Sequence, residues 1–388
     1  MKANQSTLGD ITLETFLAEY WQKNPLLIRQ GLPQFEDFLS PEELAGLSLE
    51  DHVESRLIAF NKNKKQWNLK QGPFTEQDYS NLPDNNWTLL IQSLDFWIPE
   101  SRELIEQFNF IPGWRLDDLM VSYATDEGGV GPHLDQYDVF LVQGKGQRHW
   151  RVGVPGQSVS EVTPHPLLKQ IDNFQPQIDE VLETGDVLYI PPNTPHWGKA
   201  ISECITYSVG FRAPSSAMLM EQLLLDLLEK DEITSPRYQD NFGIDKLSQS
   251  LPGNVNQWLD NITETISAKD KLIAFGKLVT RLKNDIDEVE DSIDQIVSEI
   301  SEMIADKQLQ LQLPPESRVT FRLEINICHF WINGDYLSFP EKFAEWITCL
   351  CENRNTSGKN VNISLQDIEY INRIANLYKK GWLFFNHS

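Results

Sequence analysis

The chain has 388 residues, of which 40% are hydrophobic, and its formal net charge is −24 at pH 7. This length accommodates two or three domains with cores of their own. No apolar run reaches the ~18 residues of a membrane span, and the first residues lack the apolar core of a signal peptide. We therefore expect a cytoplasmic protein without membrane contacts. Its acidic surface would repel nucleic acid and attract basic partners, although many cytosolic proteins are acidic for solubility alone.

The first hundred residues are predicted to combine short helices with strands. Apolar residues recur at helical spacing over 13–20, and Pro25 ends this helix before an apolar strand at 26–28. Ser40-Pro41 supplies an N-cap and a proline at the first helical position, so a second helix begins there. The apolar run 87–96 is predicted to be a strand.

The next predicted strand, 114–124, has one unusual face. Asp118, Met120 and Ser122 alternate with apolar residues, so their side chains point to the same side of the sheet. An acid, a thioether and a hydroxyl on one face are unusual for a core. They indicate either a site or a stripe that faces solvent, and the pattern alone does not choose between them.

A glycine-rich turn at 128–132 leads into a run rich in β-branched and aromatic residues. This pattern predicts a loop that becomes a strand, a turn at 144–146 and a further strand. His133, Asp135 and Tyr137 would share one face of the first strand. An imidazole beside a carboxylate is the beginning of a metal site.

A second motif, 185–198, contains a turn, an apolar strand, a Pro-Pro corner and His196. Two histidines and one carboxylate form the facial triad of non-haem iron(II) oxygenases, which leaves three metal positions open. His-x-Asp alone arises often by chance, but together with the second motif it favours a metal site formed by His133, Asp135 and His196. The alternative is two polar strand residues and a hydrogen-bonded loop histidine.

Between 140 and 211 the pattern is that of short strands separated by Gly or Pro turns, with a short helix expected only at 167–171. Such a series predicts a sandwich or a barrel, and the cupin-like jelly roll is the form that holds metals of this kind. The alternation over 205–211 places Thr206, Ser208 and Gly210 on one face.

Pro214 begins a helical region, 214–308, in which helices are predicted at 218–228, 255–266 and 271–282. From Ile286 to Met303 apolar residues recur at spacings of three and four, which indicates a heptad seam. The surrounding segment, Asn284–Asp306, has nine acidic residues and no basic one. A seam of roughly three heptads could join two chains or pack within its own chain.

The last region, 309–388, is predicted to contain strands at 318–331, 336–339 and 380–385 and helices at 343–351 and 365–378. Residues 311–388 hold eight Asp or Glu and eight Lys or Arg. A module that reads nucleic acid is expected to carry a basic face. Direct nucleic-acid binding is therefore not expected, and protein interaction is favoured.

The two motifs resemble the paired motifs of the JmjC branch of the cupin superfamily. The run Gly-Pro-His-Leu-Asp-Gln-Tyr-Asp-Val-Phe at 131–140 and the run Tyr-Trp-Gln-Lys-Asn-Pro-Leu-Leu-Ile-Arg at 20–29 are similar to the bacterial ribosomal oxygenases. These enzymes hydroxylate an arginine of ribosomal protein sixteen of the large subunit. The resemblance covers the whole chain and is strongest between about residues 15 and 212.

This resemblance implies a fold of three parts. A mainly β JmjC/cupin catalytic domain, a double-stranded β-helix jelly roll, would occupy 1–213. A helical dimerisation domain would follow at 214–308, and a winged-helix-like α+β domain at 309–388. The protein would then be a homodimer.

The resemblance also implies a cofactor and cosubstrates, namely Fe(II), 2-oxoglutarate and O2. The iron would be held by His133, Asp135 and His196. The cosubstrate 2-oxoglutarate would be held by Ser122 and Arg148, since an arginine offers its distal carboxylate a fixed bidentate fork. Arg148 could instead be a surface charge beside Lys145 and Arg151. His149 and His165 have no partner at metal-ligand spacing and are not expected to bind metal.

An arginine substrate requires a carboxylate for its guanidinium and flat or soft apolar surfaces for its stem. The residues that match the family's substrate pocket are Asp118, Met120, Tyr137 and Ser208. The predicted partner is thus a basic ribosomal protein. Three alternatives remain: hydroxylation of a ribosomal histidine, a cupin-type dioxygenase or isomerase for a small molecule, and a metal-free binding module. A metal-free module would lack at least one metal ligand, whereas His133, Asp135 and His196 are all present in this sequence.

Overall fold

The computed structural model describes residues 5–212, 214–229, 266–306, 308–356 and 363–385. The chain divides into two compact units, 1–213 and 214–388. The helix predicted at 255–266 lies, except for its last residue, outside the described residues. Of the helices in the described ranges, none is long and apolar enough to cross a membrane.

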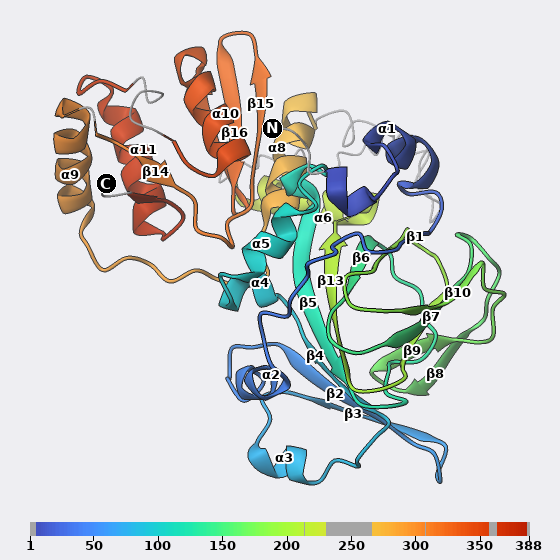
Figure 1. Ribbon diagram of the computed structural model, residues 1–388. Helices are drawn as coiled ribbons and strands as arrows, with labels where there is room; N and C mark the ends of the chain where they lie inside the picture. Colours follow the sequence, from blue (N-terminus) through green and yellow to red (C-terminus); the bar gives the residue numbers. More distant parts are fainter. Residues whose placement is uncertain (1–4, 213, 230–265, 307, 357–362, 386–388) are drawn as a thin grey trace, which may run out of the picture. The chain divides into compact units, whose positions relative to one another are not determined.

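An eight-stranded antiparallel sheet is the frame of the N-terminal unit (Figure 1). Its strand order, β1-β11-β6-β13-β5-β4-β2-β3, brings β5 beside β13 although they are far apart in sequence. The strands are β1 (Leu26–Ile28), β2 (Ser55–Asn61), β3 (Gln66–Gln71), β4 (Trp87–Ile91), β5 (Leu116–Ala124), β6 (Asp138–Gln143), β11 (Val187–Ile190) and β13 (Cys204–Phe211).

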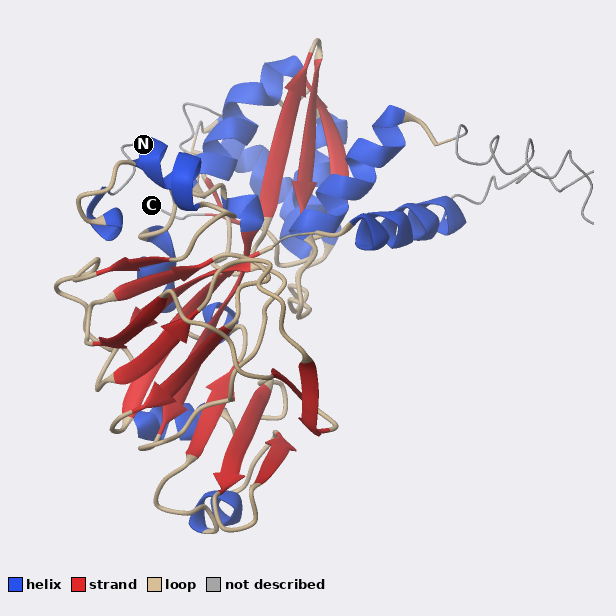
Figure 2. Ribbon diagram, turned by 90° about the vertical axis from the view of Figure 1, so that its right-hand side faces the viewer, coloured by secondary structure: helices blue, strands red, loops and turns tan. Residues whose placement is uncertain are grey.

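A smaller sheet, of order β10-β7-β12, packs against one face of the large sheet (Figure 2). Its strands are β7 (Arg148–Val152), β10 (Ile178–Leu182) and β12 (His196–Ala200), and a separate hairpin is formed by β8 (Glu161–His165) and β9 (Leu168–Ile171). One apolar cluster joins the two sheets: it contains Leu141 and Leu188 of the large sheet and Trp150 and Leu182 of the small one. This arrangement confirms the predicted mainly β jelly roll.

Short helices contribute to the core on the opposite face of the large sheet. They are η1 (Gln5–Leu8), α1 (Leu13–Thr15), η2 (Phe16–Tyr20), α2 (Pro41–Leu47), α3 (Glu76–Ser80), α4 (Leu94–Trp97), α5 (Ser101–Glu106) and η3 (Gly113–Arg115). Phe16 is fully buried, with its ring centroid 5.2 Å from that of Tyr189. Helix α2 begins where predicted, because Ser40 and Glu43 form a reciprocal capping box.

The alternation along β5 divides its side chains between these two faces. Leu119 and Val121 are fully buried in the core shared with the helices. Asp118, Met120 and Ser122 point to the other side, where they line a cavity. The face predicted to be unusual thus points inward and is not a solvent-facing stripe.

Three local predictions in the N-terminal unit are wrong. Strand β4 ends at Ile91, because Ser93 adopts a left-handed φ of 50° and α4 starts directly after it. The segment expected to be a short helix at 167–171 is strand β9, since pairing with β8 overrides its local preference. The residues 133–137 precede β6, which begins only at Asp138; an extended loop and a strand show the same alternation.

The C-terminal unit contains a three-stranded antiparallel sheet, β15-β16-β17, with helices around it. Its elements are α6 (Ser216–Glu229), α8 (Ala268–Thr280), α9 (Ile293–Ala305), β14 (Leu311–Gln312), β15 (Val319–Glu324), β16 (Ile327–Ile332), β17 (Asp335–Pro340), η5 (Glu341–Phe343), α10 (Ala344–Asn353), α11 (Ile368–Lys379) and β18 (Phe384–Phe385). The run predicted as strand at 318–331 is interrupted by a turn at 325–326, and the strand predicted at 380–385 covers only 384–385. Helix α8 lies close to the sheet: the Trp331 indole donates to the Ile273 carbonyl, and a Cβ at Gly276 would lie 2.2 Å from the Trp331 ring.

The predicted heptad seam packs within its own chain. Helix α9 begins only at Ile293, so the first part of the seam is not helical. Ile296 and Ile300 have exposed fractions of 1% and 0%, and they belong to the same hydrophobic core as residues of α10 and α11. Of the two roles that the spacing allowed, these residues take the intrachain one.

Candidate active site

A cavity of about 310 Å³ lies in the N-terminal unit between its two sheets. Side chains from β2, β4, β5, β6 and β13 of the large sheet line it, together with β7 and β12 of the small sheet and the loop that leads into β6. All nine residues that the sequence singled out for a site are among its lining residues: Asp118, Met120, Ser122, His133, Asp135, Tyr137, Arg148, His196 and Ser208.

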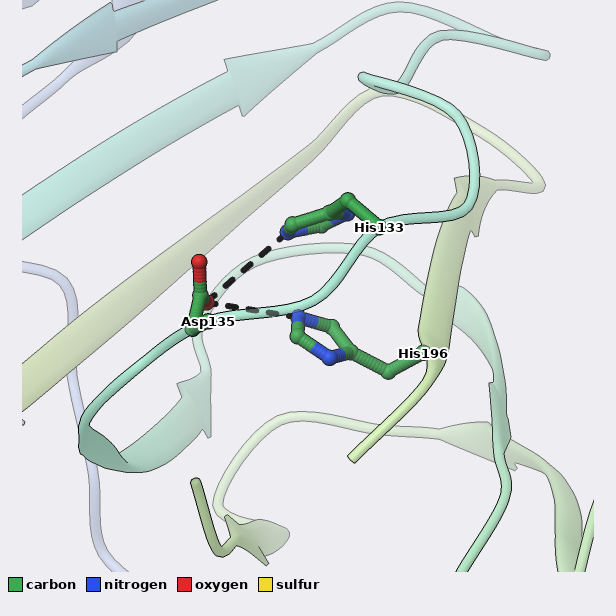
Figure 3. Close-up of side chains that lie close together, drawn as sticks. All are labelled: His133, Asp135 and His196. Carbon is green, nitrogen blue, oxygen red and sulfur yellow. Dashed lines mark ion pairs between the residues drawn. The ribbon is translucent and has the colours of Figure 1, made fainter. Parts of the chain in front are cut away.

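His133, Asp135 and His196 converge at one point of this cavity (Figure 3). One ligand atom from each lies within 4.8 Å of the others. The Asp135 Oδ2 atom is 3.5 Å from His196 Nε2 and 3.9 Å from His133 Nε2. Among the described residues this is the only group of three His, Cys, Asp or Glu side chains with such geometry. The arrangement could hold a divalent metal through two nitrogens and one oxygen.

Backbone contacts fix the orientation of both imidazoles. His133 Nδ1 lies 3.0 Å from the Gly131 carbonyl oxygen, and His196 Nδ1 lies 2.8 Å from that of Thr194. Each carbonyl accepts a hydrogen bond from the Nδ1–H group, which leaves the Nε2 lone pair directed at the shared centre. The two histidines also exchange backbone hydrogen bonds of 2.9 and 3.0 Å, so the loop before β6 is fastened to the start of β12.

The protonation states of the three side chains suit a metal. Burial, and after it the neighbouring His196, lowers the pKa of His133 to about 4. Burial by itself raises the pKa of Asp135, but the hydrogen bond to His196 and the two nearby imidazoles outweigh it and hold this pKa at about 2. Near neutral pH His133 is therefore uncharged and Asp135 ionised, as metal ligands must be.

Arg148 is a buried cation in the same cavity. It is only 5% exposed, which excludes the alternative that it is a surface charge. Its Nη1 donates to Ser122 Oγ at 3.1 Å, and its guanidinium lies 5.8 Å from the centroid of the Trp150 ring. Its Nε and Nη2 are buried and have no hydrogen-bond partner among the described residues. Because a buried guanidinium is costly without an acceptor, these two N–H groups fit a carboxylate.

The four residues predicted to bind substrate lie on neighbouring elements. Ser208 of β13 stands directly opposite Met120 of β5 in the sheet register. Asp118 is 6% exposed and precedes Met120 on the same face. Burial, followed by the charges of Asp135 and Asp118, raises the pKa of Tyr137, so that its phenol stays neutral. The cavity thus offers a cationic side chain one carboxylate with an aromatic and a thioether surface.

The two histidines not expected to bind metal lie outside the cavity lining. His149 Nε2 is 2.5 Å from Asp179 Oδ1 in the neighbouring strand β10. His165 Nδ1 accepts a hydrogen bond from the Leu167 backbone in the β8–β9 turn.

Comparison with known proteins identifies the family. Residues 103–219 match the JmjC domain, and residues 272–384 match the ROXA-like winged helix. The ribosomal protein uL16 3-hydroxylase of Escherichia coli K12 is 34% identical over 373 residues, which cover 95% of this chain and 96% of that protein. The chain belongs to the JmjC-domain ribosomal oxygenases.

Further similarities of this ribosomal oxygenase agree with that assignment. A probable ribosomal oxygenase of Haemophilus influenzae is 40% identical over 222 residues, covering 57% of this chain and 54% of that one. The crystal structure of the Escherichia coli ribosomal oxygenase YcfD with cobalt and 2-oxoglutarate superposes with a TM-score of 0.78 at 31% identity, over 97% of this chain and 99% of that one. The predicted fold, a JmjC jelly roll followed by helices and a winged helix, is confirmed. The winged-helix match begins at residue 272, within α8.

Sequence reasoning missed several polar residues of this ribosomal oxygenase's cavity. Arg56 of β2, Thr88 of β4 and Gln92 just after β4 all line it. The signal was present in the alternation, because Thr88, Leu90 and Gln92 share one face, as do Arg56 and Ile58. It could be used only once β4 and β2 were known to follow β5 in the sheet.

Proposed function

We propose that this ribosomal oxygenase uses Fe(II), 2-oxoglutarate and O2 to hydroxylate an arginine side chain of large-subunit ribosomal protein uL16. One observation carries the proposal. A single cavity is lined by the two-histidine, one-carboxylate group, by the buried Arg148 and by the acid Asp118. The name of the Escherichia coli relative, a uL16 3-hydroxylase, supports the choice of substrate.

His133, Asp135 and His196 would hold the iron. Their nitrogen and carboxylate donors form the set typical of non-haem iron(II) oxygenases. The iron centre would supply the oxidising chemistry that converts a C–H bond into C–OH at the expense of 2-oxoglutarate and O2. The protein itself contributes placement and the exclusion of water.

Arg148 and Ser122 would bind the distal carboxylate of 2-oxoglutarate. In the described part of the chain the guanidinium nitrogens Nε and Nη2 have no acceptor, while Nη1 donates to the Ser122 hydroxyl. A carboxylate is the ligand that accepts two such parallel hydrogen bonds.

We expect Arg148→Ala to raise the apparent KM for 2-oxoglutarate by about a hundredfold, because truncating one partner of a buried ion pair typically costs ~3 kcal/mol or more. Metal affinity should change little. Steady-state kinetics and calorimetric titration of the metal measure the two effects. Arg151→Ala is the matched control, since Arg151 lies on the same strand but pairs with Asp179 outside the cavity. An unchanged KM in Arg148→Ala would assign the carboxylate to another cation.

The arginine side chain of the substrate would lie between Asp118, Met120, Tyr137 and Ser208. A guanidinium keeps its charge, so a desolvated pocket must provide a carboxylate. Asp118 supplies one, and this feature favours arginine over histidine, whose imidazole can enter such a pocket uncharged. A small-molecule substrate is less well supported, because the whole chain aligns with a ribosomal protein hydroxylase.

Mass spectrometry tests this function. Purified protein with Fe(II) and 2-oxoglutarate should add one oxygen atom to an arginine within a uL16 fragment, and ribosomes from cells that lack the protein should lack this oxygen. A matching fragment with lysine at that arginine should remain unmodified. Oxygen found on a histidine of another ribosomal protein, with uL16 unchanged, would replace the arginine assignment by the histidine alternative.

We further propose a homodimer formed through the helical region, with α6 as its contact. This helix exposes five large apolar side chains, with exposed fractions between 42% and 72%: Met218, Met220, Leu224, Leu225 and Leu228. Such an apolar face is typical of an interaction surface. The α9 seam is unsuitable because its central residues Ile296 and Ile300 are buried in their own chain.

Replacing both Leu224 and Leu228 with lysine should convert the dimer into a monomer, because two charges would have to be desolvated in the interface. Light scattering at roughly tens of micromolar protein measures the mass. Ile325→Lys is the control: this residue is 90% exposed and belongs to the β15–β16 turn, not to α6. A wild-type protein that is itself monomeric at this concentration contradicts the dimer.

The proposed substrate places the protein in the cytoplasm, where ribosomes assemble. Direct binding to nucleic acid is not part of the proposal, since the last region of the chain has equal numbers of acidic and basic residues.

A further inference from the structure

A chain of hydrogen bonds leads from β2 across β4 to the acid of the cavity. Arg56 Nη2 donates to Gln92 Oε1 at 3.1 Å, and Gln92 Nε2 donates to Asp118 Oδ2 at 3.0 Å. All three residues line the cavity. Neither Arg56 nor Gln92 belongs to the residues proposed to bind the iron, 2-oxoglutarate or the substrate side chain.

The chain has a fixed direction. An amide side chain can present either its oxygen or its nitrogen to a neighbour, but a guanidinium has donors only. Arg56 therefore holds the oxygen of Gln92 towards itself, and the amide nitrogen must face Asp118. In this orientation Gln92 always offers a donor, never an acceptor, to the carboxylate.

The residue after Gln92 adds to the same contact. Ser93 donates its backbone N–H to Asp118 Oδ2 at 3.2 Å, and its Oγ lies 3.4 Å from the same oxygen. Ser93 has a left-handed φ of 50°, a conformation that costs a non-glycine residue roughly 1 kcal/mol or more. Two residues further on, Asp95 Oδ1 accepts the Leu119 backbone N–H at 2.9 Å. The turn after β4 thus fixes both the carboxylate and the backbone beside it.

Gly210 lies near the other oxygen of Asp118. A Cβ at this position would lie 3.4 Å from Asp118 Oδ1 and 3.8 Å from the Tyr137 ring, which are ordinary contact distances. The donors of Gln92 and Ser93 thus reach Oδ2, while Oδ1 lies on the side of Gly210 and Tyr137.

We propose that Gln92 and Arg56 are positioning residues that fix the Asp118 carboxylate for a cationic substrate side chain, with Arg56 acting through Gln92. This inference rests on the proposed function, in which Asp118 binds the substrate guanidinium. A buried carboxylate with donors on one oxygen is held in one orientation, so less ordering remains when the substrate arrives. The pair thereby sets the preference for a charged side chain over a neutral one of the same shape.

The test compares two peptides that differ only in charge, an arginine peptide and its citrulline analogue. Gln92→Leu should raise the KM for the arginine peptide by about tenfold or more, the worth of one hydrogen bond to a charged group, and change that for the citrulline peptide by less than about threefold. Gln92→Met, which keeps the length of the side chain, should change the two KM values in the same way as Gln92→Leu. Equal increases for both peptides would mean a general loss of pocket shape, and an unchanged arginine KM would remove Gln92 from recognition.

A double-mutant cycle tests whether Arg56 acts through Gln92. Arg56→Met should raise the KM for the arginine peptide in the wild-type background but add nothing in Gln92→Leu. Arg56→Lys should retain near wild-type KM, because lysine is also a donor without an acceptor. Equal effects of Arg56→Met in both backgrounds would show that Arg56 contacts the substrate directly. This result would overturn the relay, that is, the action of Arg56 on Asp118 through Gln92.

Two further variants distinguish a failure of the relay from a failure of the role proposed for Asp118. Lys70→Met removes a cation from the adjacent strand β3, where Lys70 pairs with Asp78 outside the cavity, and should leave both peptides unaffected. Asp118→Ala tests the role of the acid. A loss of arginine hydroxylation in Asp118→Ala with no effect in Gln92→Leu rejects the relay and leaves the proposed function intact. No loss in Asp118→Ala removes Asp118 from recognition and the relay with it, while arginine hydroxylation itself is tested by the mass spectrometry of uL16.

Discussion

Replacing His196 with alanine is expected to abolish iron-dependent turnover of 2-oxoglutarate. His196 is 2% exposed, its Nδ1 is held by the Thr194 carbonyl, and its Nε2 lies 3.5 Å from Asp135. Apart from His133, no other histidine of the described residues reaches the same point, so only His133 and Asp135 would remain where the iron requires three ligands. We expect turnover to fall to the level of the metal-free protein.

The measurements are metal affinity by calorimetric titration with Co²⁺ and decarboxylation of 2-oxoglutarate. Metal affinity should fall together with activity, which separates loss of a ligand from loss of a catalytic side chain. His149→Ala is the matched control, because that imidazole pairs with Asp179 outside the cavity and should leave both values near those of the wild type. Full activity of His196→Ala would remove this histidine from the metal site and with it the facial triad.

The residues brought together in this site could be predicted where chemistry follows local spacing. His133 and Asp135 stand two residues apart, and His196 follows a Gly-Asp and Pro-Pro pattern, so their association needs only the motif. The inward face of β5 follows from alternation, because a strand repeats every two residues whatever its neighbours are. Both inferences depend on a short stretch of chain.

Features that depend on long-range pairing were inaccessible. Gln92 and Asp118 meet because β4 pairs with β5, and Arg56 joins them because β2 pairs with β4. No local pattern states that order. The heptad spacing of 286–303 was similarly ambiguous, since an apolar seam is the same whether a second chain or the chain's own α11 covers it. The end of β4 depends on one residue, Ser93, whose left-handed backbone the sequence does not mark.

Asp118→Ala is expected to reduce hydroxylation of the arginine peptide by at least about a hundredfold, because the guanidinium would enter a desolvated pocket without its counter-charge. Slow decarboxylation of 2-oxoglutarate without substrate should survive, since Arg148, Ser122 and the three proposed metal ligands are untouched. The ratio of decarboxylation to hydroxylation should therefore rise steeply. Measuring succinate and hydroxylated peptide in the same reaction yields this ratio.

Asp117→Ala is the matched control for this prediction. Asp117 is the preceding residue on β5, where it pairs with Arg212 at 3.2 Å and does not line the cavity. The Asp117→Ala substitution removes the same charge from the same strand, so it reports any effect that a change in net charge alone has on hydroxylation. Raising the salt concentration should weaken peptide binding similarly in the wild type and Asp117→Ala, because steering by an acidic surface is screened over ~8 Å at physiological ionic strength.

The two substrates distinguish the remaining alternatives. If Asp118 recognises a guanidinium, its removal should cost the arginine peptide far more than a histidine peptide, whose imidazole can bind uncharged. Normal hydroxylation of the arginine peptide by Asp118→Ala would remove Asp118 from substrate recognition, whereas a wild-type preference for the histidine peptide would contradict the arginine assignment. The triad and Arg148 would be unaffected by either result, because they serve the cosubstrate and not the side chain that is hydroxylated.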